Sequence, residues 1–509
     1  MTRPVQVDGG GLTDAPPLAW TWTVAAGLAS GALLSLGVRL PLGPWLHVAA
    51  FLPLLWCLDR RPSGRRALLC GALTGLGVAA PAFEGLLLAA PLAYPVALLG
   101  SALIFGLAMA ATAWIRAGLG RAAMLAMWPA LWLAAEWLPS LRVLWGDLAI
   151  PIARVAYAHA DTPLLRLAPW SGPGAATLAV LLIGLALHLA LHDGRRRPLA
   201  TTALGVALLS PIVLGVALSP APAPVEGAEP RSVVAVQASV PTVDTIAGRF
   251  DDEVARRLLE LHVALSQRAQ RREPDLIVWA ETVLPRPIDP DAPSPEVADA
   301  LDRAFGATPH ALVGAITERP GGLHNAVLVW RDGALAEVYR KRTLLPWIET
   351  SDYRRGPAVP PVALDDAAVG AAVCLDVTFP GVVRDAVRAG AELLVLVTND
   401  DFAIGTVTPA LHLAVARFRA AETARPLLFA GQSGPTAFVD ARGRVVSALE
   451  PTERAALAGT LLPHTGTTPF VRLGDWISAL GTAFAVFATG VGLAAVTADG
   501  LRRRRTGGP

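Results

Sequence analysis

The chain has 509 residues, of which 53% are hydrophobic and only 17% charged, and its mean hydropathy is +0.48. This composition exceeds what a water-soluble interior holds and predicts a multidomain membrane protein. The formal net charge of +2 is scattered between apolar runs, which argues against a nucleic-acid-binding protein. The three cysteines, Cys57, Cys70 and Cys374, are too few and too dispersed for a disulfide framework.

Residues 1–220 are predicted to form a seven-helix transmembrane domain, because apolar runs close to the 20 residues needed to cross a bilayer follow one another. A further span is expected in the last part of the chain, 474–509, which ends in a basic tail. The predicted spans are 18–37, 43–58, 67–85, 92–115, 122–139, 172–192, 199–219 and, in that last part, 475–496.

Arginine-rich and arginine-poor loops alternate along these spans. The rich loops are "DRRPSGRR" after the second span, the turn with Arg116 and Arg121, "RRR" at 195–197 and "RRRR" at 502–505. By the positive-inside rule these loops are cytoplasmic, which places both termini inside and the segment between the last two spans on the outer face. The first span has no basic region or cleavage site before it, so we expect it to be retained.

The segment 138–171 is too polar to span a membrane and too apolar for an ordinary loop. Trp137, Trp145, Tyr157 and Trp170, which lie in it or at its edge, are aromatic residues of the kind that prefers the headgroup level. Two interpretations stay open, a plain interfacial belt and a lipid-facing rim beneath the outer domain.

Residues 221–473 are predicted to form an extracytoplasmic α/β domain, entered through the Pro- and Ala-rich linker 219–232. Short β-branched runs alternate there with helical patterns such as 250–270 and 411–425, which is typical of a layered α/β fold with buried strands. Examples of these strand-like runs are 232–239, 275–281, 311–317, 325–330, 368–374, 392–398 and 427–433.

Three reactive side chains stand at or just beyond the ends of strand-like runs, where open α/β sheets bind ligands. They are Glu281 in "LIVWAET", Lys341 in "VYRKRT" and Cys374 in "AAVCLD". A carboxylate that accepts the thiol proton, a thiolate that attacks a carbonyl and an ammonium that stabilises the oxyanion suffice for acyl transfer.

Each of these residues also has a structural interpretation, since Glu281 can assist a helix N-terminus and Cys374 can be a core residue. Lys341 fits that interpretation least. It is the only lysine in the chain, and arginine supplies every other basic side chain, including the neighbouring Arg340 and Arg342. A compact ammonium fits a tight site that a planar guanidinium does not.

The order Glu281, Lys341, Cys374, with "LIVWAET", "Y-R-K" and "C-L-D", resembles the nitrilase superfamily of carbon-nitrogen hydrolases. With spans before and after that domain, the chain resembles in particular the membrane-embedded apolipoprotein N-acyltransferase family. The resemblance implies an αββα sandwich with a Glu–Lys–Cys triad, in addition to the multi-span helical domain.

The resemblance also indicates supporting residues. Glu349, eight residues after Lys341, matches a second glutamate of the family's lysine motif, and Asn325 in "HNAV" matches its asparagine. Leu375 and Asp376 replace the tyrosine and glutamate of the family's "CYE", and "NDDFAIG" (399–405) lacks the family's tryptophan. These departures bear on substrate identity more than on the reaction.

The function implied by the resemblance is N-acylation in the bacterial cytoplasmic (inner) membrane. Cys374, deprotonated by Glu281, would take an acyl chain from a phospholipid as a thioester, with Lys341 and the Leu375 N–H holding the oxyanion. The acceptor would be the α-amino group of a diacylglyceryl-cysteine on a lipoprotein. Glu349 and Asp376 would orient Lys341 or balance its charge. No cofactor or metal is expected, since the nine histidines form no ligand cluster.

Three alternatives remain from the sequence. The first is a membrane-anchored amidase of the nitrilase type, since the same triad accepts water. The second is an acyltransferase of this architecture with another acceptor. The third is a catalytically silent homologue that acts as a membrane scaffold, for which loss of a triad member would be expected.

Overall fold

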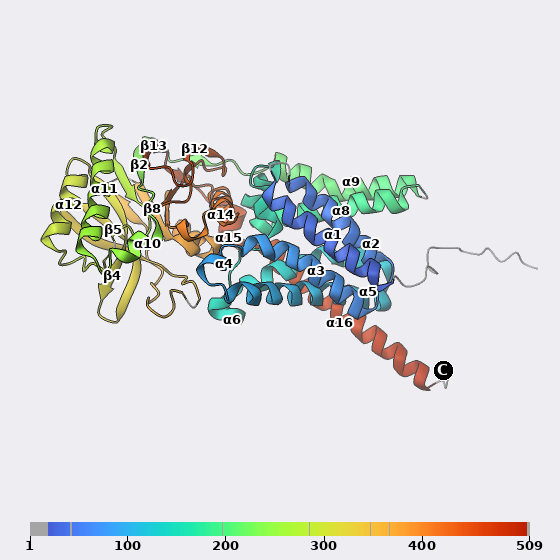
Figure 1. Cartoon of the computed structure of the whole chain (residues 1–509). Helices are drawn as coiled ribbons and strands as arrows, with labels where there is room; N and C mark the ends of the chain where they lie inside the picture. Colours follow the sequence, from blue (N-terminus) through green and yellow to red (C-terminus); the bar gives the residue numbers. More distant parts are fainter. Residues whose placement is uncertain are drawn as a thin grey trace, which may run out of the picture.

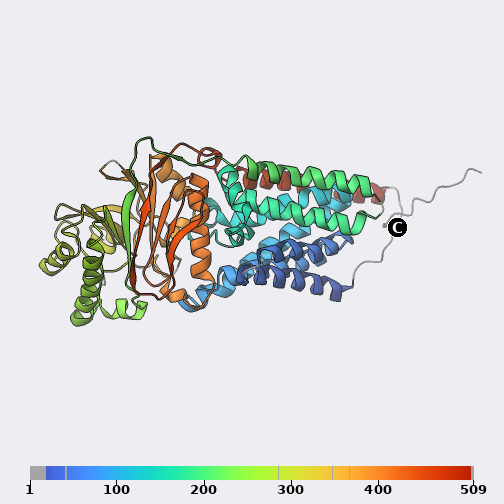
Figure 2. The same ribbon diagram turned by 90° about the horizontal axis from the view of Figure 1, so that it is seen from above.

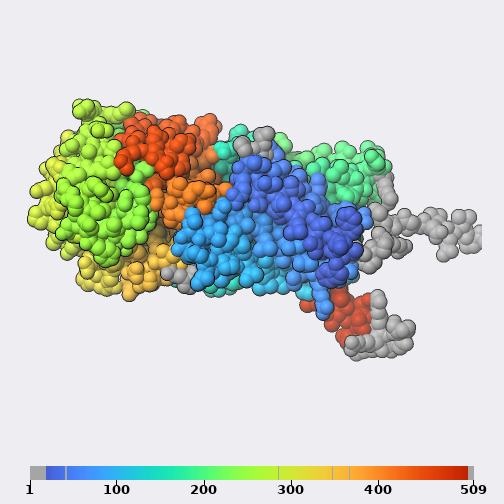
Figure 3. All heavy atoms as spheres, in the orientation of Figure 1, coloured from blue at the N-terminus to red at the C-terminus, as the bar shows by residue number. Residues whose placement is uncertain are grey.

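The structure is a computed structural model of the whole chain, in which residues 19–40, 43–195, 197–284, 286–346, 348–365 and 367–505 are described, with the backbone alone for 503–505. Residues 1–18, residue 196 of the predicted "RRR" loop and the side chains of 503–505 in the "RRRR" segment therefore lie outside the description. The described chain forms a bundle of long helices at one end and an α/β domain at the other (Figure 1). The two parts are in direct contact on the face shown in Figure 3.

The helical bundle is built from the apolar runs of the sequence. Five helices among the described residues are long and apolar enough to cross a membrane, and α2 is apolar but shorter. The predicted spans 92–115 and 122–139 both fall within one long helix, α5, which is broken at Gly120 (φ 90°, ψ 178°), a backbone conformation that favours glycine. The helices of the bundle are α1 (Trp20–Arg39), α2 (Pro44–Asp59), α3 (Gly64–Ala82), α4 (Leu86–Ala89), α5 (Ala93–Trp137), α8 (Pro173–Asp193), α9 (Pro198–Ala217) and α16 (Trp476–Arg505).

Charged side chains pair at the end of the bundle that lies away from the α/β domain. Asp59, at the end of α2, accepts from Arg116 Nη1 at 2.8 Å and from Arg121 Nη2 at 2.7 Å. Arg121 also reaches Asp193, the last residue of α8, at 2.8 Å. These pairs close the polar end of the bundle around the break at Gly120.

The segment between α5 and α8 forms short helical turns that lie between the bundle and the α/β domain. They are η2 (Leu138–Ser140), α6 (Arg142–Trp145), η3 (Gly146–Leu148), η4 (Val155–His159), η5 (Pro163–Leu167) and α7 (Ala168–Ser171). Around α6, Val143, Leu144 and Trp145 are exposed, as a lipid-facing rim requires. Tyr157 is instead fully buried and its hydroxyl accepts from Arg419 Nη2 at 3.3 Å, so its side chain does not face lipid.

The α/β domain contains two stacked six-stranded sheets, ordered β12-β11-β10-β9-β8-β7 and β13-β2-β3-β4-β5-β6. Their strands are β2 (Arg231–Gln237), β3 (Leu276–Trp279), β4 (His310–Arg319), β5 (Gly322–Arg331), β6 (Ala334–Arg340), β7 (Val362–Leu364), β8 (Ala367–Val373), β9 (Leu393–Thr398), β10 (Leu427–Gly431), β11 (Thr436–Val439), β12 (Val445–Leu449) and β13 (Ala455–Leu461). A short pair, β1 (Ala223–Pro224) with β14 (His464–Thr465), ties the linker to the end of the domain.

Helices cover the outer faces of both sheets, which confirms the predicted αββα sandwich (Figure 2). Leu259 and Trp279 belong to the apolar core under α10 (Thr242–Ala247), α11 (Asp252–Gln270) and α12 (Pro295–Phe305). Val278 and Val395 belong to the core between the sheets. The second sheet is covered by α13 (Pro380–Arg388) and α14 (Thr408–Thr423), and α15 (Pro469–Leu473) leads into α16.

The α13–α14 layer also faces the membrane helices. Phe418 of α14 belongs to the same apolar core as Trp132 of α5, so the two parts share one continuous interior. Paired charges also cross this junction, because Arg417 Nη1 of α14 lies 2.7 Å from Asp161 Oδ1 in the segment between α5 and α8. The α/β domain is thus held against the bundle by packing and by paired charges.

Candidate active site

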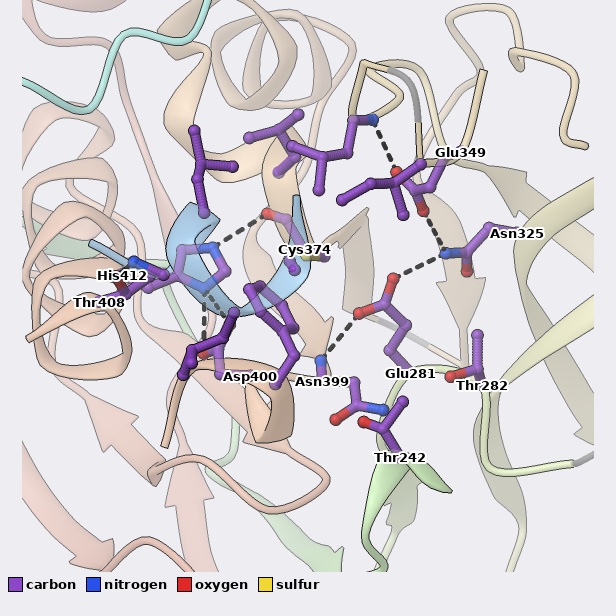
Figure 4. Close-up of a pocket in the computed structure, with 18 of the residues that line it drawn as sticks. Thr242, Glu281, Thr282, Asn325, Glu349, Cys374, Asn399, Asp400, Thr408 and His412 are labelled. Atoms are coloured by element: carbon purple, nitrogen blue, oxygen red, sulfur yellow. Dashed lines mark hydrogen bonds and ion pairs between the residues drawn. The ribbon is translucent and has the colours of Figure 1, made fainter. Parts of the chain in front are cut away.

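Glu281, Lys341 and Cys374 line one cavity of about 550 Å³, at the edge where β3, β6 and β8 end. Asn325 and Glu349 line the same cavity, and Figure 4 shows their side chains turned toward it. The structure therefore brings together residues that are up to 93 positions apart in the sequence.

The position of Glu281 follows from the way β3 ends. The strand stops at Trp279, and Thr282 has a φ of 52°, so the chain turns sharply directly after the carboxylate. Gly314 of β4 allows this turn, because a Cβ at that position would lie 2.8 Å from the Glu281 Cα. Glu281 is only 4% exposed, so its carboxylate is held inside the domain.

Lys341 lies directly after β6 and is 2% exposed. Its ammonium donates to Glu349 Oε1 at 2.7 Å and to Glu281 Oε1 at 3.2 Å. Its backbone N–H donates to the Asn325 carbonyl at 2.8 Å, which fixes where the side chain starts. The lysine thus bridges two buried carboxylates.

Asn325 and the surrounding backbone complete the coordination of the two carboxylates. The Asn325 amide donates to Glu281 Oε1 at 2.7 Å and to Glu349 Oε1 at 3.2 Å. Glu281 Oε2 accepts the Asn399 N–H at 2.8 Å, and Glu349 Oε2 accepts the Leu345 N–H at 2.8 Å. Both carboxylates are therefore fixed on each of their oxygens, as in a preorganised site.

Cys374 follows β8 and begins the short helix η6 (Cys374–Thr378) with a φ of 48°, an uncommon backbone conformation for a cysteine. His412 of α14 holds this turn, because its Nε2 lies 3.2 Å from the Cys374 carbonyl oxygen. The other ring nitrogen, Nδ1, lies 2.9 Å from Asp400 Oδ1. A carbonyl oxygen and a carboxylate both accept hydrogen bonds, so these partners favour an imidazolium with two N–H donors.

Burial and charge shift the titration of the three central groups. Burial raises the pKa of Glu281, although the Lys341 charge opposes this. Burial and the negative charge of Glu281 raise the pKa of the Cys374 thiol well above its usual value, while Lys341 lowers it. Burial alone would lower the pKa of Lys341. The negative charges of Glu281 and Glu349, together with that of Cys374 when its thiol is ionised, outweigh burial and raise this pKa well above its usual value. The resting site therefore holds a thiol beside a charged lysine.

Asp376 lies close to the site but contacts the loop after Lys341 instead of the ammonium. Its carboxylate accepts from the Thr343 N–H at 2.8 Å, the Arg342 N–H at 3.1 Å and the Tyr339 hydroxyl at 2.7 Å. It therefore joins the lysine loop to the cysteine turn. Leu375, the next residue, also lines the cavity. Its N–H is in the same peptide group as the Cys374 carbonyl, which His412 contacts.

Asn399, Asp400 and His412 were not among the predicted site residues. "TND" follows β9, which pairs in parallel with β8, and parallel strands bring their carboxyl ends to the same edge of a sheet. That rule applied to β9 indicates Asn399 and Asp400. His412 has no such signal, because α14 returns to the cavity only through the tertiary fold.

One wall of the cavity comes from the helical bundle. Phe83, Leu86 and Leu88 lie at the α3–α4 end of the bundle, and Ile150 and Ile152 come from the bridging segment. Two hydrogen bonds fasten this wall to the start of α14, one from the Gly85 N–H to Thr408 Oγ1 at 2.9 Å and one from the Val407 N–H to Glu84 Oε2 at 3.2 Å.

The arrangement brings a thiol, a carboxylate and an ammonium group into one partly apolar cavity, a set of groups that can support acyl transfer. Among the described residues, no group of three or more His, Cys, Asp or Glu side chains is arranged to hold a metal ion.

Comparison with known proteins matches both parts of the chain. Residues 252–464 match the family described as carbon-nitrogen hydrolase, and residues 30–186 match the apolipoprotein N-acyltransferase N-terminal domain. Among solved structures, Nit3 of Saccharomyces cerevisiae, from branch 10 of the nitrilase superfamily, is 18% identical with a TM-score of 0.39, and the similarity covers 46% of this chain and 91% of Nit3. An amidase from Nesterenkonia sp. is 20% identical with a TM-score of 0.35, covering 47% of this chain and 92% of the amidase. The match to the family model shows that the second half of the chain contains a carbon-nitrogen hydrolase domain.

The full-length similarity is more specific. The apolipoprotein N-acyltransferase of Azotobacter vinelandii is 29% identical over 487 residues, which cover 88% of this chain and 91% of the relative. That of Bordetella bronchiseptica is 32% identical over 398 residues, which cover 69% of this chain and 70% of the relative. The chain belongs to the apolipoprotein N-acyltransferase family.

Proposed function

We propose that this protein transfers an acyl chain from a phospholipid, through a thioester on Cys374, to the α-amino group of a diacylglyceryl-cysteine at the N-terminus of a bacterial lipoprotein. The observation that carries this proposal is the shared wall of the cavity. Cys374, Glu281 and Lys341 face side chains from the end of the helical bundle, including Phe83 and Leu88. An ester of a membrane lipid reaches such a cavity without leaving the bilayer surface.

In the first half-reaction Glu281 accepts the Cys374 thiol proton, and the thiolate attacks the ester carbonyl carbon. Lys341 Nζ and the Leu375 N–H hold the oxyanion that forms. The bond between this carbon and the glycerol oxygen then breaks, and Glu281 returns the proton to the glycerol oxygen. A lysophospholipid leaves and the acyl thioester stays on Cys374.

In the second half-reaction the lipoprotein amine attacks the thioester carbonyl carbon. Glu281 accepts a proton from the amine nitrogen, the carbon–sulfur bond breaks, and the thiolate leaves with the stabilisation of the Lys341 charge. The product is an amide, and proton transfer from Glu281 restores the thiol.

The surrounding residues act through these three. Glu349 and Asn325 hold Lys341 and Glu281 at hydrogen-bond distance. Asp376 orients the lysine loop, and His412 orients the peptide between Cys374 and Leu375. No step of the proposed reaction requires a cofactor.

The proposed topology places the protein in the inner membrane, with both termini in the cytoplasm. The transmembrane domain comprises residues 1–220, the periplasmic catalytic domain 221–473, and the final helix with its basic tail 474–509. Both substrates are lipid-anchored in this proposal, so a site held at the bilayer raises their effective concentration by confining their diffusion to two dimensions. The apolar wall favours a lipid donor over the small amide of an amidase.

The test incubates the membrane-embedded protein with phospholipid labelled in its acyl chain. We expect one hydroxylamine-sensitive acyl group, which peptide mapping assigns to Cys374, and its transfer to a diacylglyceryl-peptide added afterwards. Cys374→Ala should carry no label, whereas Cys57→Ala should be labelled like the unchanged protein, because Cys57 is buried in the bundle.

The two halves of the proposal fail separately. Folded protein that stays unlabelled refutes the phospholipid thioester. Label that forms on Cys374 but passes only to water identifies a hydrolase, and label that passes only to another amine identifies a different acceptor.

A further inference from the structure

A second cavity lies on a face of the protein that the proposed reaction does not use. It has a volume of about 460 Å³ and shares no lining residue with the catalytic cavity. The bridging segment forms one side at 160–166, and the turn between β11 and β12 forms the other. Four arginines line it: Arg166, Arg417, Arg442 and Arg444.

The charge of this cavity is unbalanced. Arg417 is satisfied by Asp161 at 2.7 Å and by the carbonyls of Ala160 and Gly443 at 2.8 and 2.9 Å. Arg444 pairs with Asp440 at 2.7 Å. The side chains of Arg166 and Arg442 are exposed and have no hydrogen-bond or ion-pair partner in the described part of the chain. Two positive charges therefore face the cavity unpaired.

An apolar groove of about 330 Å³ lies beside this cavity. It runs between the adjoining ends of α8, α9 and α16, where Leu178, Ile212 and Trp476 line it. A small cavity lies between the two hollows. It shares Arg166 and Arg442 with the arginine-lined cavity. Its Ser219 directly follows Leu218, which lines the groove.

The groove borders the least covered helix of the bundle. No residue of α9 is buried, and Figure 2 shows this helix at the edge of the bundle beside α8. Two tryptophans line the groove, Trp170 and Trp476. The Trp170 indole N–H donates to the Gly215 carbonyl at 3.0 Å, and Trp476 is the first residue of α16. Tryptophan prefers the headgroup level, so these residues indicate where the bilayer surface meets the groove.

We propose that this composite site binds one anionic phospholipid from the leaflet that faces the α/β domain, with its phosphate between Arg166 and Arg442 and an acyl chain in the α8–α9–α16 groove. The unpaired arginines select a net negative headgroup over a zwitterionic one, because the nearby carboxylates Asp161 and Asp440 already have arginine partners. The acyl chain covers part of α9, and the lipid thereby joins α9 to the α/β domain.

The test uses the full chain carrying Cys374→Ala, so that no acyl transfer consumes the lipid. The detergent-solubilised protein is mixed with phosphatidylglycerol or with phosphatidylcholine, and native mass spectrometry counts the lipids retained. We expect one more phosphatidylglycerol than phosphatidylcholine per protein. Adding Arg166→Gln and Arg442→Gln should remove this extra lipid, with at least a tenfold weaker apparent affinity. Arg257→Gln, on the exposed face of α11, serves as the matched charge control and should retain it.

A second variant separates a lipid from a free anion. Ile212→Trp fills the groove from α9 and leaves both arginines intact, so it should also release the extra phosphatidylglycerol. Equal retention of the two lipids by the parent protein would overturn the proposal, as would full retention in the double-arginine variant. Inorganic phosphate that displaces the lipid at equal concentration, with no effect of Ile212→Trp, would show an anion site and would equally overturn it.

Discussion

Lys341 occupies a space that suits a compact cation. Its Nζ lies 2.7 Å from Glu349 and 3.2 Å from Glu281, the Asn325 amide reaches the same two oxygens, and the side chain is 2% exposed. A planar guanidinium is larger and needs other angles. We therefore expect Lys341→Arg to reduce acyl transfer by about 10²-fold or more, the scale of losing one oxyanion donor. The initial rate of transfer from labelled phospholipid measures this.

The control is the opposite substitution, arginine to lysine, at the preceding residue Arg340. Arg340→Lys keeps the charge at a side chain that pairs with Glu337 instead of lining the cavity, so its activity should stay within about twofold of the unchanged protein. Equal activity of Lys341→Arg and Arg340→Lys would contradict the role given to the lysine.

The charge of Lys341 also sets the reactivity of the thiol. Because this charge lowers the pKa of Cys374, removing it in Lys341→Met raises that pKa further above its usual value. The thiolate is the species that iodoacetamide alkylates, so at a fixed pH below the pKa the alkylation rate should fall, and the rate–pH curve should move to higher pH. Mass spectrometry of the Cys374 peptide follows the rate. A curve that stays in place would show that Lys341 does not act on the thiol.

Single residues show how far sequence reasoning reaches within the site. Glu281, Lys341 and Cys374 were predicted as a group because each follows a strand-like run, and the structure places all three on one cavity. Asp376 was predicted to orient Lys341 or balance its charge, and its described hydrogen bonds go to the loop after Lys341 and to Tyr339. Sequence spacing cannot give that contact, because it depends on how the loop after β6 folds back over the cysteine turn.

At the scale of elements, α14 contacts the turn that carries Cys374. The Nε2 of His412 holds the Cys374 carbonyl at 3.2 Å, in a turn with a φ of 48°. In His412→Asn, the shorter side chain should lose the hydrogen bond to the Cys374 carbonyl, while its amide stays near Asp400. A hydrogen bond to a charged donor is worth about 1.5–3 kcal/mol, so we expect kcat to fall by roughly 10- to 100-fold with little change in KM for the phospholipid.

The comparison variant is His464→Asn, at a half-buried histidine of β14 that bonds its own loop at the Leu462 carbonyl. It should retain full activity. A rise in KM with unchanged kcat in His412→Asn would show that the histidine binds substrate and does not position Cys374.

The elements themselves were predictable to different degrees. The strands β3, β9 and β10 are fully buried, and β2 is buried along most of its length. All four contain continuous apolar runs and were predicted within a few residues of their ends. The strands β6 and β12 were not predicted, because both are half-exposed and their sequences, such as "ALAEVYR", lack a clear apolar run. Their pairing with β5 and β11 gives them their structure.

At the scale of the whole molecule, the sequence indicated two parts but not how they meet. The apolar runs predicted the bundle. Only Arg116 and Arg121, on either side of the break at Gly120, indicated that the α5 region comprises two spans. The junction depends on contacts between distant segments, such as Arg417 with Asp161 and Gly85 with Thr408. Such long-range pairs leave no periodic signal in one sequence. The membrane-derived wall of the cavity was therefore found only in the structure.

That wall makes a prediction that separates lipid access from chemistry. Leu88 of α4 lines the catalytic cavity and is 59% exposed, whereas Leu87 beside it is 44% exposed and does not line the cavity. Leu88→Asp places a charge where an acyl chain must pass, so acylation of Cys374 by phospholipid should fall at least tenfold. Its alkylation by water-soluble iodoacetamide should change by less than about twofold.

Leu87→Asp introduces the same charge on the same short helix and should affect neither reaction by more than about twofold, because its side chain lies outside the cavity. Equal loss of phospholipid acylation in both variants would show that α4 acts through general membrane insertion. Unchanged acylation in Leu88→Asp would show that the donor enters from another side. Selective loss in Leu88→Asp alone would tie the end of the bundle to the nucleophile as one continuous path for the acyl chain.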